Sequence, residues 1–391
     1  MTRAAEIRVR LRKPLERSVR SGHPWLYRDA LEPFAAVPGA VIAVLDKAGR
    51  VIARGLADDG PIAVRIFVAR DEPLDDALLA RRIAAALALR ARVVPPATDG
   101  YRLLHGEGDR LPGVVCDRYG AHAVLKLDGP AASAWQPRIV EQLRAPLAAL
   151  GVHGLLLRSG KKHAQQSEPL YGEPPAEELV IEEHGMKLCA NLWRGQKTGL
   201  FLDHRESRRR VRALAGGLRV LNLYGYTGGF SIAAGLGGAR EVTTVDSAAP
   251  ALALAERSWL QNALDPAIHH TRAADVPELL AQLAQRRERF ELIIADPPSF
   301  APNAQSKPAA LQSYAALHAS CLALLTDGGF YLAASCSSHV TAEDFDASLR
   351  EGARQSRRVL QILERSTAPA DHPRLLAFPE GDYLKVVLTR T

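Results

Sequence analysis

The stretch Val220-Leu221-Asn222-Leu223-Tyr224-Gly225-Tyr226-Thr227-Gly228-Gly229-Phe230 runs from an apolar strand through a glycine-rich loop into a helix. Glycines in such a loop let the backbone pass close to a ligand. Further along, Val242-Thr243-Thr244-Val245-Asp246 is a second strand that ends in a carboxylate. A carboxylate at this position can accept both ribose hydroxyls of a nucleoside. The two segments together predict an α/β fold that binds a nucleoside cofactor.

Strands and helices alternate regularly around this stretch. Strands are expected at 219–224, 241–246, 269–273, 290–295, 329–335 and 383–388. Helices are expected at 204–215, 229–235, 248–262, 276–287, 308–326 and 341–355. This order predicts a parallel sheet with helices on both faces. The last strand follows a Pro-rich loop with no clear preceding helix, so it is expected to run antiparallel to its neighbours.

Two of these strands end in segments suited to catalysis, Asp296-Pro297-Pro298-Ser299-Phe300 and Ser335-Cys336-Ser337-Ser338-His339. Open α/β sheets bind ligands at the carboxyl ends of their strands. An acid-Pro-Pro turn beside a thiol indicates chemistry on a flat heterocycle that needs a nucleophile. Asp275 follows the third strand, where it either reaches an adenine amino group or caps the next helix.

The loop composition narrows the cofactor. The segment with Tyr224, Tyr226, Thr227, Gly228 and Phe230 lacks the GxGxxG order of dinucleotide folds, and no Walker A lysine follows it. The loop, Asp246 and the Asp-Pro-Pro turn together indicate S-adenosylmethionine rather than NAD or ATP.

The amino-terminal part has a different pattern, with short strands expected at 7–11, 41–45, 51–55 and 63–67. It reads as a small β-rich barrel. Residues 1–28 carry eight Lys or Arg against two Glu, and the whole chain has a net charge of +7. Both values favour a polyanionic partner that is contacted through its phosphates.

The middle of the chain mixes both element types. A helix is expected at 75–92, a hairpin of 113–119 with 122–127, a helix at 135–150 and a strand at 154–158. Residues 168–178, rich in Pro and Glu, are interpreted as a linker. The expected domains are therefore 1–73, 74–178 and 179–391.

The four cysteines, at 116, 189, 321 and 336, show neither metal-ligand spacing nor a disulfide framework. This usage fits a reducing cytoplasm. No apolar run is long enough for a membrane span, and no metal site is expected.

Several motifs resemble one family. They are Ile181-Glu182-Glu183-His184-Gly185-Met186-Lys187-Leu188, Lys197-Thr198-Gly199, Phe201-Leu202-Asp203-His204-Arg205, Tyr226-Thr227-Gly228-Gly229-Phe230, Asp296-Pro297-Pro298-Ser299-Phe300 and Ser335-Cys336-Ser337. In this order they resemble the bacterial PUA-domain 23S rRNA (cytosine-5)-methyltransferases of the RlmI type. His23-Pro24-Trp25-Leu26-Tyr27 and Phe378-Pro379-Glu380-Gly381 extend the similarity to both ends of the chain.

The resemblance implies an amino-terminal PUA barrel that binds RNA, a middle α+β domain and a Rossmann-like class I methyltransferase domain. It also implies that Asp203 and Arg205 help enclose S-adenosylmethionine. Two positions depart from the family, because Ser299 stands where Lys is frequent and His204 where Gln is common.

A cysteine nucleophile would explain how carbon 5 of cytosine could accept a methyl group. Carbon 5 of cytosine is a poor nucleophile until a thiolate adds to carbon 6, and such covalent catalysis divides one difficult step into two easier ones. Cys336 is the predicted nucleophile, and a basic cleft could lower its pKa. Asp296 is expected to contact the base amine or ring nitrogen.

Other side chains are expected to hold the substrate. Pro297 and Pro298 would stiffen the turn, and Phe300 would stack on the base. Lys197 and the arginines at 208–212 are candidates for a basic rim around the RNA, although a helix cannot point all of them one way.

Alternatives remain at this stage. Cys336 could be an inert buried thiol, and the target could be a guanine nitrogen, which needs no thiol. A non-catalytic RNA-binding assembly factor is a third possibility, and a homodimer is compatible with each. The group that removes the carbon-5 proton is open among water, a carboxylate and His339.

Overall fold

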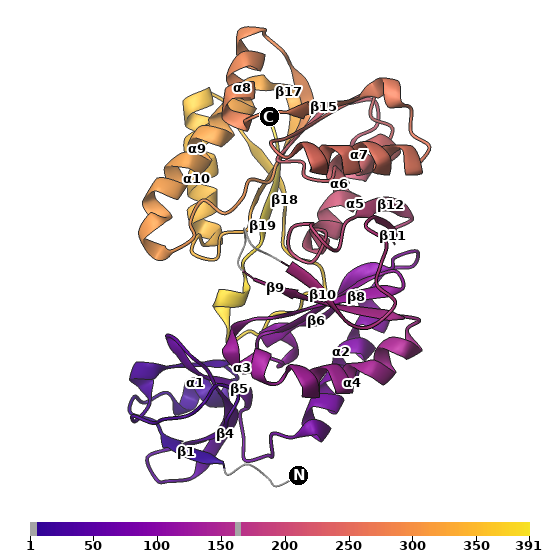
Figure 1. The fold of residues 1–391 in the computed structure, drawn as a ribbon. Helices are drawn as coiled ribbons and strands as arrows, with labels where there is room; N and C mark the ends of the chain where they lie inside the picture. The colour runs from indigo at the N-terminus through magenta and orange to yellow at the C-terminus, as the bar shows by residue number, and fades with distance from the viewer. Residues whose placement is uncertain (1–5, 161–165) are drawn as a thin grey trace.

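The computed structural model describes residues 6–160 and 166–391. Three β-sheets follow one another along the chain, and a two-stranded hairpin separates the second from the third (Figure 1). Within the described residues, no helix is long and apolar enough to cross a membrane.

The first sheet has five strands in the order β1-β3-β4-β5-β2. Ile42 and Val44 alternate toward its core, where they pack with Val64 and with Val19 from a short helix. All four expected strands are present, and the three-residue β2 is an addition. The elements are β1 (Ile7–Arg10), α1 (Glu16–Arg20), β2 (Trp25–Tyr27), η1 (Arg28–Ala30), β3 (Val41–Leu45), β4 (Val51–Ala57) and β5 (Ile62–Val68).

The second sheet also has five strands, in the order β10-β9-β8-β7-β6. Its β7–β8 hairpin turns at Gly120, as predicted. The predicted linker at 168–178 was partly wrong, because its first residues belong to edge strand β10, and an edge strand tolerates a proline such as Pro169. The elements are α2 (Asp76–Val93), β6 (Gly100–His105), η2 (Gly106–Asp109), β7 (Val114–Tyr119), β8 (His122–Leu127), α3 (Gly129–Ala134), α4 (Gln136–Ala149), β9 (Gly154–Ser159) and β10 (Gln166–Gly172).

The third sheet has seven strands in the order β15-β14-β13-β16-β17-β19-β18. The first five are mutually parallel, and β19 pairs antiparallel with β17, which confirms the predicted reversal. Strand β18 was not predicted, because its mostly exposed side chains at the sheet edge give no apolar run. The strands are β13 (Arg219–Leu223), β14 (Glu241–Asp246), β15 (His269–Ala273), β16 (Phe290–Ala295), β17 (Leu325–Ser335), β18 (Gln361–Ser366) and β19 (Lys385–Arg390).

Successive residues of the central strands face opposite cores. Val220 and Leu292 pack with α5, α6 and α7, whereas Leu221 and Ile293 pack with α8, α9 and α10. The result is an α/β doubly wound layer, the predicted fold class. Its helices are α5 (Arg205–Leu214), α6 (Gly229–Leu236), α7 (Ala249–Gln261), α8 (Val276–Gln285), α9 (Lys307–Leu324) and α10 (Ala342–Ser356).

Short elements connect these layers. The hairpin before the third sheet consists of β11 (Leu179–Glu183) and β12 (Met186–Ala190), and 3-10 turns are η3 (Leu202–His204), η4 (Pro266–Ile268), η5 (Ala304–Ser306) and η6 (Pro379–Gly381). After β18 the chain extends to the other two sheets, where Phe378 packs edge-on against Trp25 with ring centroids 4.5 Å apart. This extension is the yellow segment that reaches the purple part of the molecule in Figure 1.

Candidate cofactor and catalytic site

A cavity of about 190 Å³ lies at the carboxyl ends of β13, β14, β16 and β17. Strand β13 sits between β14 and β16, at the switch point where open α/β sheets bind ligands. The structure brings most of the predicted site residues to the cavity wall: Lys197, Asp203, Tyr224, Tyr226, Thr227, Phe230, Asp246, Asp296, Pro297, Pro298 and Cys336.

Asp246 organises the glycine-rich loop. Its Oδ2 accepts a hydrogen bond from the Tyr226 backbone N–H at 2.8 Å, and its Oδ1 accepts one from Ala248 N–H at 2.9 Å. The Tyr226 hydroxyl in turn donates to the Gly199 carbonyl at 3.0 Å. The carboxylate thus stands at the cavity wall in a fixed position.

The loop's close packing requires its glycines. A Cβ at Gly225 would lie 2.6 Å from Thr244 Cγ2. Gly228 has φ +75° at the start of α6, and a Cβ there would lie 2.6 Å from Ala255 Cβ. Gly228 therefore shapes the loop from behind and does not itself line the cavity.

Asp203 is a buried carboxylate in another part of the cavity wall. Its Oδ2 accepts hydrogen bonds from Lys197 Nζ and from the Tyr383 hydroxyl, each at 2.7 Å, while its Oδ1 has no partner among the described residues. Burial alone would raise the pKa of Asp203, but the Lys197 cation, with help from His204 and His372, holds it well below its ordinary value. The group is therefore ionised near neutral pH.

His204 connects this wall to the Asp-Pro-Pro turn. Its Nε2 lies 3.1 Å from Asp296 Oδ2, and its side chain is 2% exposed. Its Nδ1 is buried and has no hydrogen-bond partner within the described residues. The position that departs from the family pattern therefore contacts the predicted catalytic carboxylate directly.

Cys336 lies on the same cavity wall, just after β17. Burial raises the pKa of its thiol, and the Asp296 carboxylate raises it further, against the opposing Lys197 cation. The expectation of a lowered pKa was wrong for this state of the protein, because burial outweighs the basic charge nearby.

The rest of the Asp-Pro-Pro segment turns away from the cavity. Ser299 Oγ lies 2.9 Å from Ser337 Oγ, and Phe300 packs on Tyr314 with ring centroids 4.8 Å apart. Phe300 thus belongs to the core beside the site and not to its wall. Of this segment, Asp296, Pro297 and Pro298 line the cavity.

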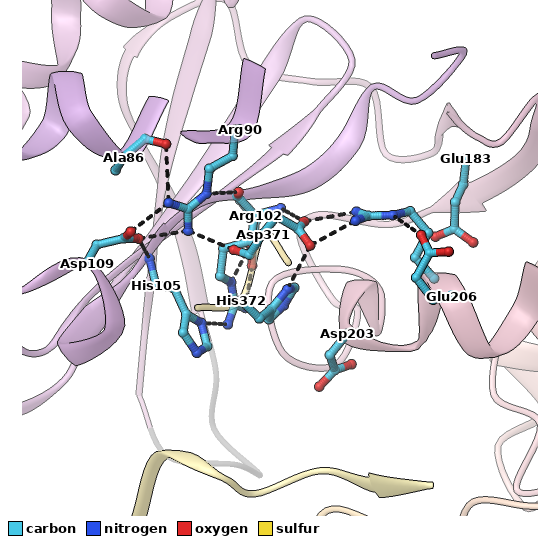
Figure 2. Close-up of polar contacts among 12 residues, drawn as sticks. Ala86, Arg90, Arg102, His105, Asp109, Glu183, Asp203, Glu206, Asp371 and His372 are labelled. Atoms are coloured by element: carbon cyan, nitrogen blue, oxygen red, sulfur yellow. Dashed lines mark hydrogen bonds and ion pairs between the residues drawn. The ribbon is translucent and has the colours of Figure 1, made fainter. Parts of the chain in front are cut away.

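Arg205 does not line the cavity, although it was expected to enclose the cofactor. Its two terminal nitrogens donate to both oxygens of Asp371 at 2.9 Å. Asp371 also accepts from Arg102 N–H, and its own carbonyl accepts from Arg90 (Figure 2). Burial alone would raise the pKa of Asp371, but His372 and Arg205 hold it below its ordinary value.

Two other predicted residues also lie elsewhere. Asp275 accepts a hydrogen bond from the Glu278 N–H at 3.2 Å and so caps α8, which is the second of its two expected roles. His339 is exposed and outside the cavity lining.

Sequence reasoning missed the contributions of the carboxyl-terminal extension. Tyr383 contacts Asp203 across 180 residues, and Asp371 meets Arg205 across 166. The strand that begins near Tyr383 was predicted to run antiparallel to its neighbours. That direction was the one sequence signal that this segment returns to the site.

The cavity suits S-adenosylmethionine. Buried polar atoms nearly always have hydrogen-bond partners, yet Asp203 Oδ1 and His204 Nδ1 in its wall have none in the described part of the chain. Carboxylates and aromatic rings line the same space, and both favour a sulfonium cation. Asp246 would hold the ribose hydroxyls.

Two family models match the chain. Residues 103–389 match the model described as S-adenosylmethionine-dependent methyltransferase, and residues 9–68 match a PUA-like domain. These matches confirm the predicted cofactor and the predicted amino-terminal fold.

Curated relatives cover nearly the whole chain. A ribosomal RNA large subunit methyltransferase of Deinococcus radiodurans is 38% identical over 98% of this chain and 97% of its own. The ribosomal RNA large subunit methyltransferase I of Cronobacter sakazakii is 35% identical over 97% of this chain and 98% of its own. The resemblance noted in the sequence is thereby confirmed.

Solved structures share the fold. A SAM-dependent methyltransferase from Streptococcus mutans superposes with a TM-score of 0.86 at 23% identity, covering 98% of this chain and 100% of its own. A methyltransferase solved in complex with SAH gives 0.87 at 24% identity, covering 99% and 100%.

Proposed function

The chain belongs to the S-adenosylmethionine-dependent methyltransferase family that includes these relatives, and from this premise we propose that it methylates carbon 5 of a cytosine in 23S rRNA. The observation that carries the proposal is the thiol of Cys336 in one cavity with Asp296 and the cofactor loop. A nitrogen target needs no such thiol. The names of the relatives support large-subunit rRNA as the substrate.

The proposed reaction begins at Cys336. The thiol loses its proton, its sulfur forms a bond to carbon 6 of the cytosine, and N3 of the ring takes up a proton. Carbon 5 becomes the nucleophilic end of an enamine. Bound S-adenosylmethionine supplies the methyl group. Loss of the carbon-5 proton to a base then expels the thiolate, and N3 gives up the proton it had taken, which restores the aromatic ring.

Asp296 is proposed to hold the base in register. Its carboxylate at the cavity wall would accept from the exocyclic amine or contact the N3 proton, while His204 fixes its other side at 3.1 Å. The Asp296–His204 pair is also the base that the cavity offers for the carbon-5 proton, because His339 lies outside it. The target base must leave its stack to reach this wall.

The three sheets support the proposed domain division. The first five-stranded sheet lies within 1–73 and the second within 74–178. The hairpin and the seven-stranded sheet lie within 179–391. In this division the PUA domain would bind RNA and the last domain would carry the chemistry.

The test is to trap the adduct. In an rRNA fragment with 5-fluorocytosine at the target, carbon 5 carries fluorine in place of the proton that has to leave. The covalent complex therefore cannot break down and should persist through denaturing electrophoresis. Cys336→Ala should abolish both the complex and turnover while S-adenosylmethionine still binds.

Cys189→Ala is the matched control, because this thiol is buried outside the cavity. A complex that forms equally with Cys336→Ala would place the nucleophile elsewhere. If the unmodified fragment is methylated but never trapped, guanine-nitrogen methylation becomes the better assignment.

A further inference from the structure

A second cavity lies where three separate parts of the chain meet. Its volume is about 350 Å³, and we name it the seam cavity. Its wall includes the end of α1, the segment after β5, helix α2 with the turn after η2, and residues 375–377 of the carboxyl-terminal extension. Four arginines line it, namely Arg20, Arg70, Arg82 and Arg110.

The carboxylates of the seam cavity are already engaged. Glu72 is bonded to Arg70 and Arg81, and Glu107 accepts from Trp25 Nε1 at 2.9 Å and from Arg65 at 3.2 Å. Within residues 6–160 and 166–391, the side chains of Arg20 and Arg110 form no ion pair or hydrogen bond. The cavity therefore carries more positive charge than its own carboxylates neutralise.

Arg82 is the most enclosed of the four. Its guanidinium donates to the Arg110 carbonyl oxygen and has no carboxylate partner in the described part of the chain. Burial, and after it the neighbouring Arg110 cation, lowers its pKa to about 10. A half-buried cation among other cations is stabilised by an anion placed between them.

The seam cavity shares part of its wall with a neighbouring cavity. Leu375 and Leu376 line both it and a neighbouring cavity of about 730 Å³ that reaches Ser338 and Lys385. Lys385 Nζ donates to the Ser337 carbonyl at 2.6 Å, one residue from Cys336. The neighbouring cavity thus extends from the wall of the seam cavity to Ser338, two residues after Cys336 in the chain.

The other basic cluster differs in its pairing. On α5, Arg208 pairs with Glu183, Arg209 with Glu206, and Arg210 with Glu364 at 2.9 Å. These arginines are neutralised within the protein, so the basic rim expected there has little free charge. Within the described residues, Arg20, Arg82 and Arg110 of the seam cavity have no carboxylate partner, so these three remain available to a ligand.

We propose that the seam cavity binds a backbone phosphate of the RNA whose target base occupies the catalytic cavity. The inference rests on the proposed RNA substrate. Arginine forks match phosphate oxygens in geometry and charge. The site would then fix the register of the strand between the PUA domain and Cys336, without reading its sequence.

The test compares RNA affinity over a range of salt concentrations. The double variant Arg82→Gln/Arg110→Gln should bind a 23S rRNA fragment more weakly. Its slope of log affinity against log salt should be smaller by about 0.7, the value for one phosphate contact on a single strand. The loss should therefore be largest at low salt and shrink as salt rises.

The control is Arg92→Gln/Arg286→Gln, which removes two exposed arginines outside the cavity. Arg20→Gln alone serves if the double variant unfolds, because this side chain is exposed at the end of α1. Equal affinities and slopes for the seam and control variants would overturn the inference.

Two further arms separate the explanations. Inorganic phosphate that stabilises the wild type but not the seam variant, with RNA binding unchanged, would make this a free-phosphate site and overturn the RNA assignment. A seam variant with reduced RNA affinity supports the inference even if the product is methylguanine, in which case only the proposed cytosine chemistry fails.

Discussion

Asp203 and His204 face the cofactor cavity, whereas Arg205, the next residue, faces the junction with the middle sheet. Each of the first two keeps one buried polar atom without a partner among the described residues. All three guanidinium nitrogens of Arg205 are bonded, two to Asp371 and one to Glu206. One short turn thus has a face left open for a ligand and a face that is saturated by the protein itself.

The saturated face should matter most for stability. Asp371→Ala would leave Arg205 charged, 1% exposed and without its bidentate partner. Breaking a buried pair in this way typically costs about 3–5 kcal/mol. Urea denaturation should show this loss in the free energy of unfolding, whereas Asp76→Ala, which breaks an exposed pair with Arg138, should cost under about 1 kcal/mol.

Asp371 should also make the stability of the protein depend on pH in the acidic range. The pKa of Asp371 is lowered in the folded state, so its contribution is complete above the ordinary carboxyl pKa of about 4 and is lost as the pH falls below it. Asp371→Asn should therefore flatten the decline of stability in this acidic range. An unchanged acid slope would mean that Arg205 does not depend on this carboxylate.

The open face was easier to anticipate from sequence than the saturated one. Asp246 is the last residue of β14 and Cys336 directly follows β17, so strand prediction alone places them at one edge of the sheet. Arg205 lies beside Asp203 in the same motif but pairs with a residue 166 positions away, which local patterns cannot show. The direction of the Cys336 pKa shift depends on burial, which is also a property of the assembled fold.

Asp246 tests the open face. Asp246→Ala should weaken S-adenosylmethionine binding by roughly 1–3 kcal/mol, because a polar group of the ligand loses its partner. Asp275→Ala is the control, since it removes the cap of α8 outside the cavity. It should cost about 1 kcal/mol of stability and leave cofactor affinity unchanged in isothermal titration. Weaker binding by Asp275→Ala would instead support its contact with adenine.

Cys336 allows a test by pH. Because the pKa of its thiol is raised, the rate of iodoacetamide labelling in the free protein should increase about tenfold per pH unit until the pH exceeds the ordinary thiol pKa. Mass spectrometry of the labelled peptide distinguishes labelling of Cys336 from labelling of the three buried cysteines. A rate that levels off below pH 8 would show a lowered pKa and restore the original expectation.

The His204→Gln substitution should have the smallest effect of these changes. It distinguishes two roles of His204, positioning Asp296 or accepting the carbon-5 proton. A glutamine amide can donate a hydrogen bond to Asp296, whose Oδ2 lies 3.1 Å from the histidine Nε2, but unlike an imidazole it cannot exchange a proton near neutral pH. If His204 acts as a positioning residue, His204→Gln should keep kcat within about tenfold, or 1.4 kcal/mol, with an unchanged pH profile. His204→Ala should lose more, because Asp296 is then unsupported. The family that the sequence motifs resemble commonly carries glutamine at this position, which favours the positioning role. Equal losses in the Gln and Ala variants, with one limb of the pH profile removed in both, would instead make His204 the acceptor of the carbon-5 proton.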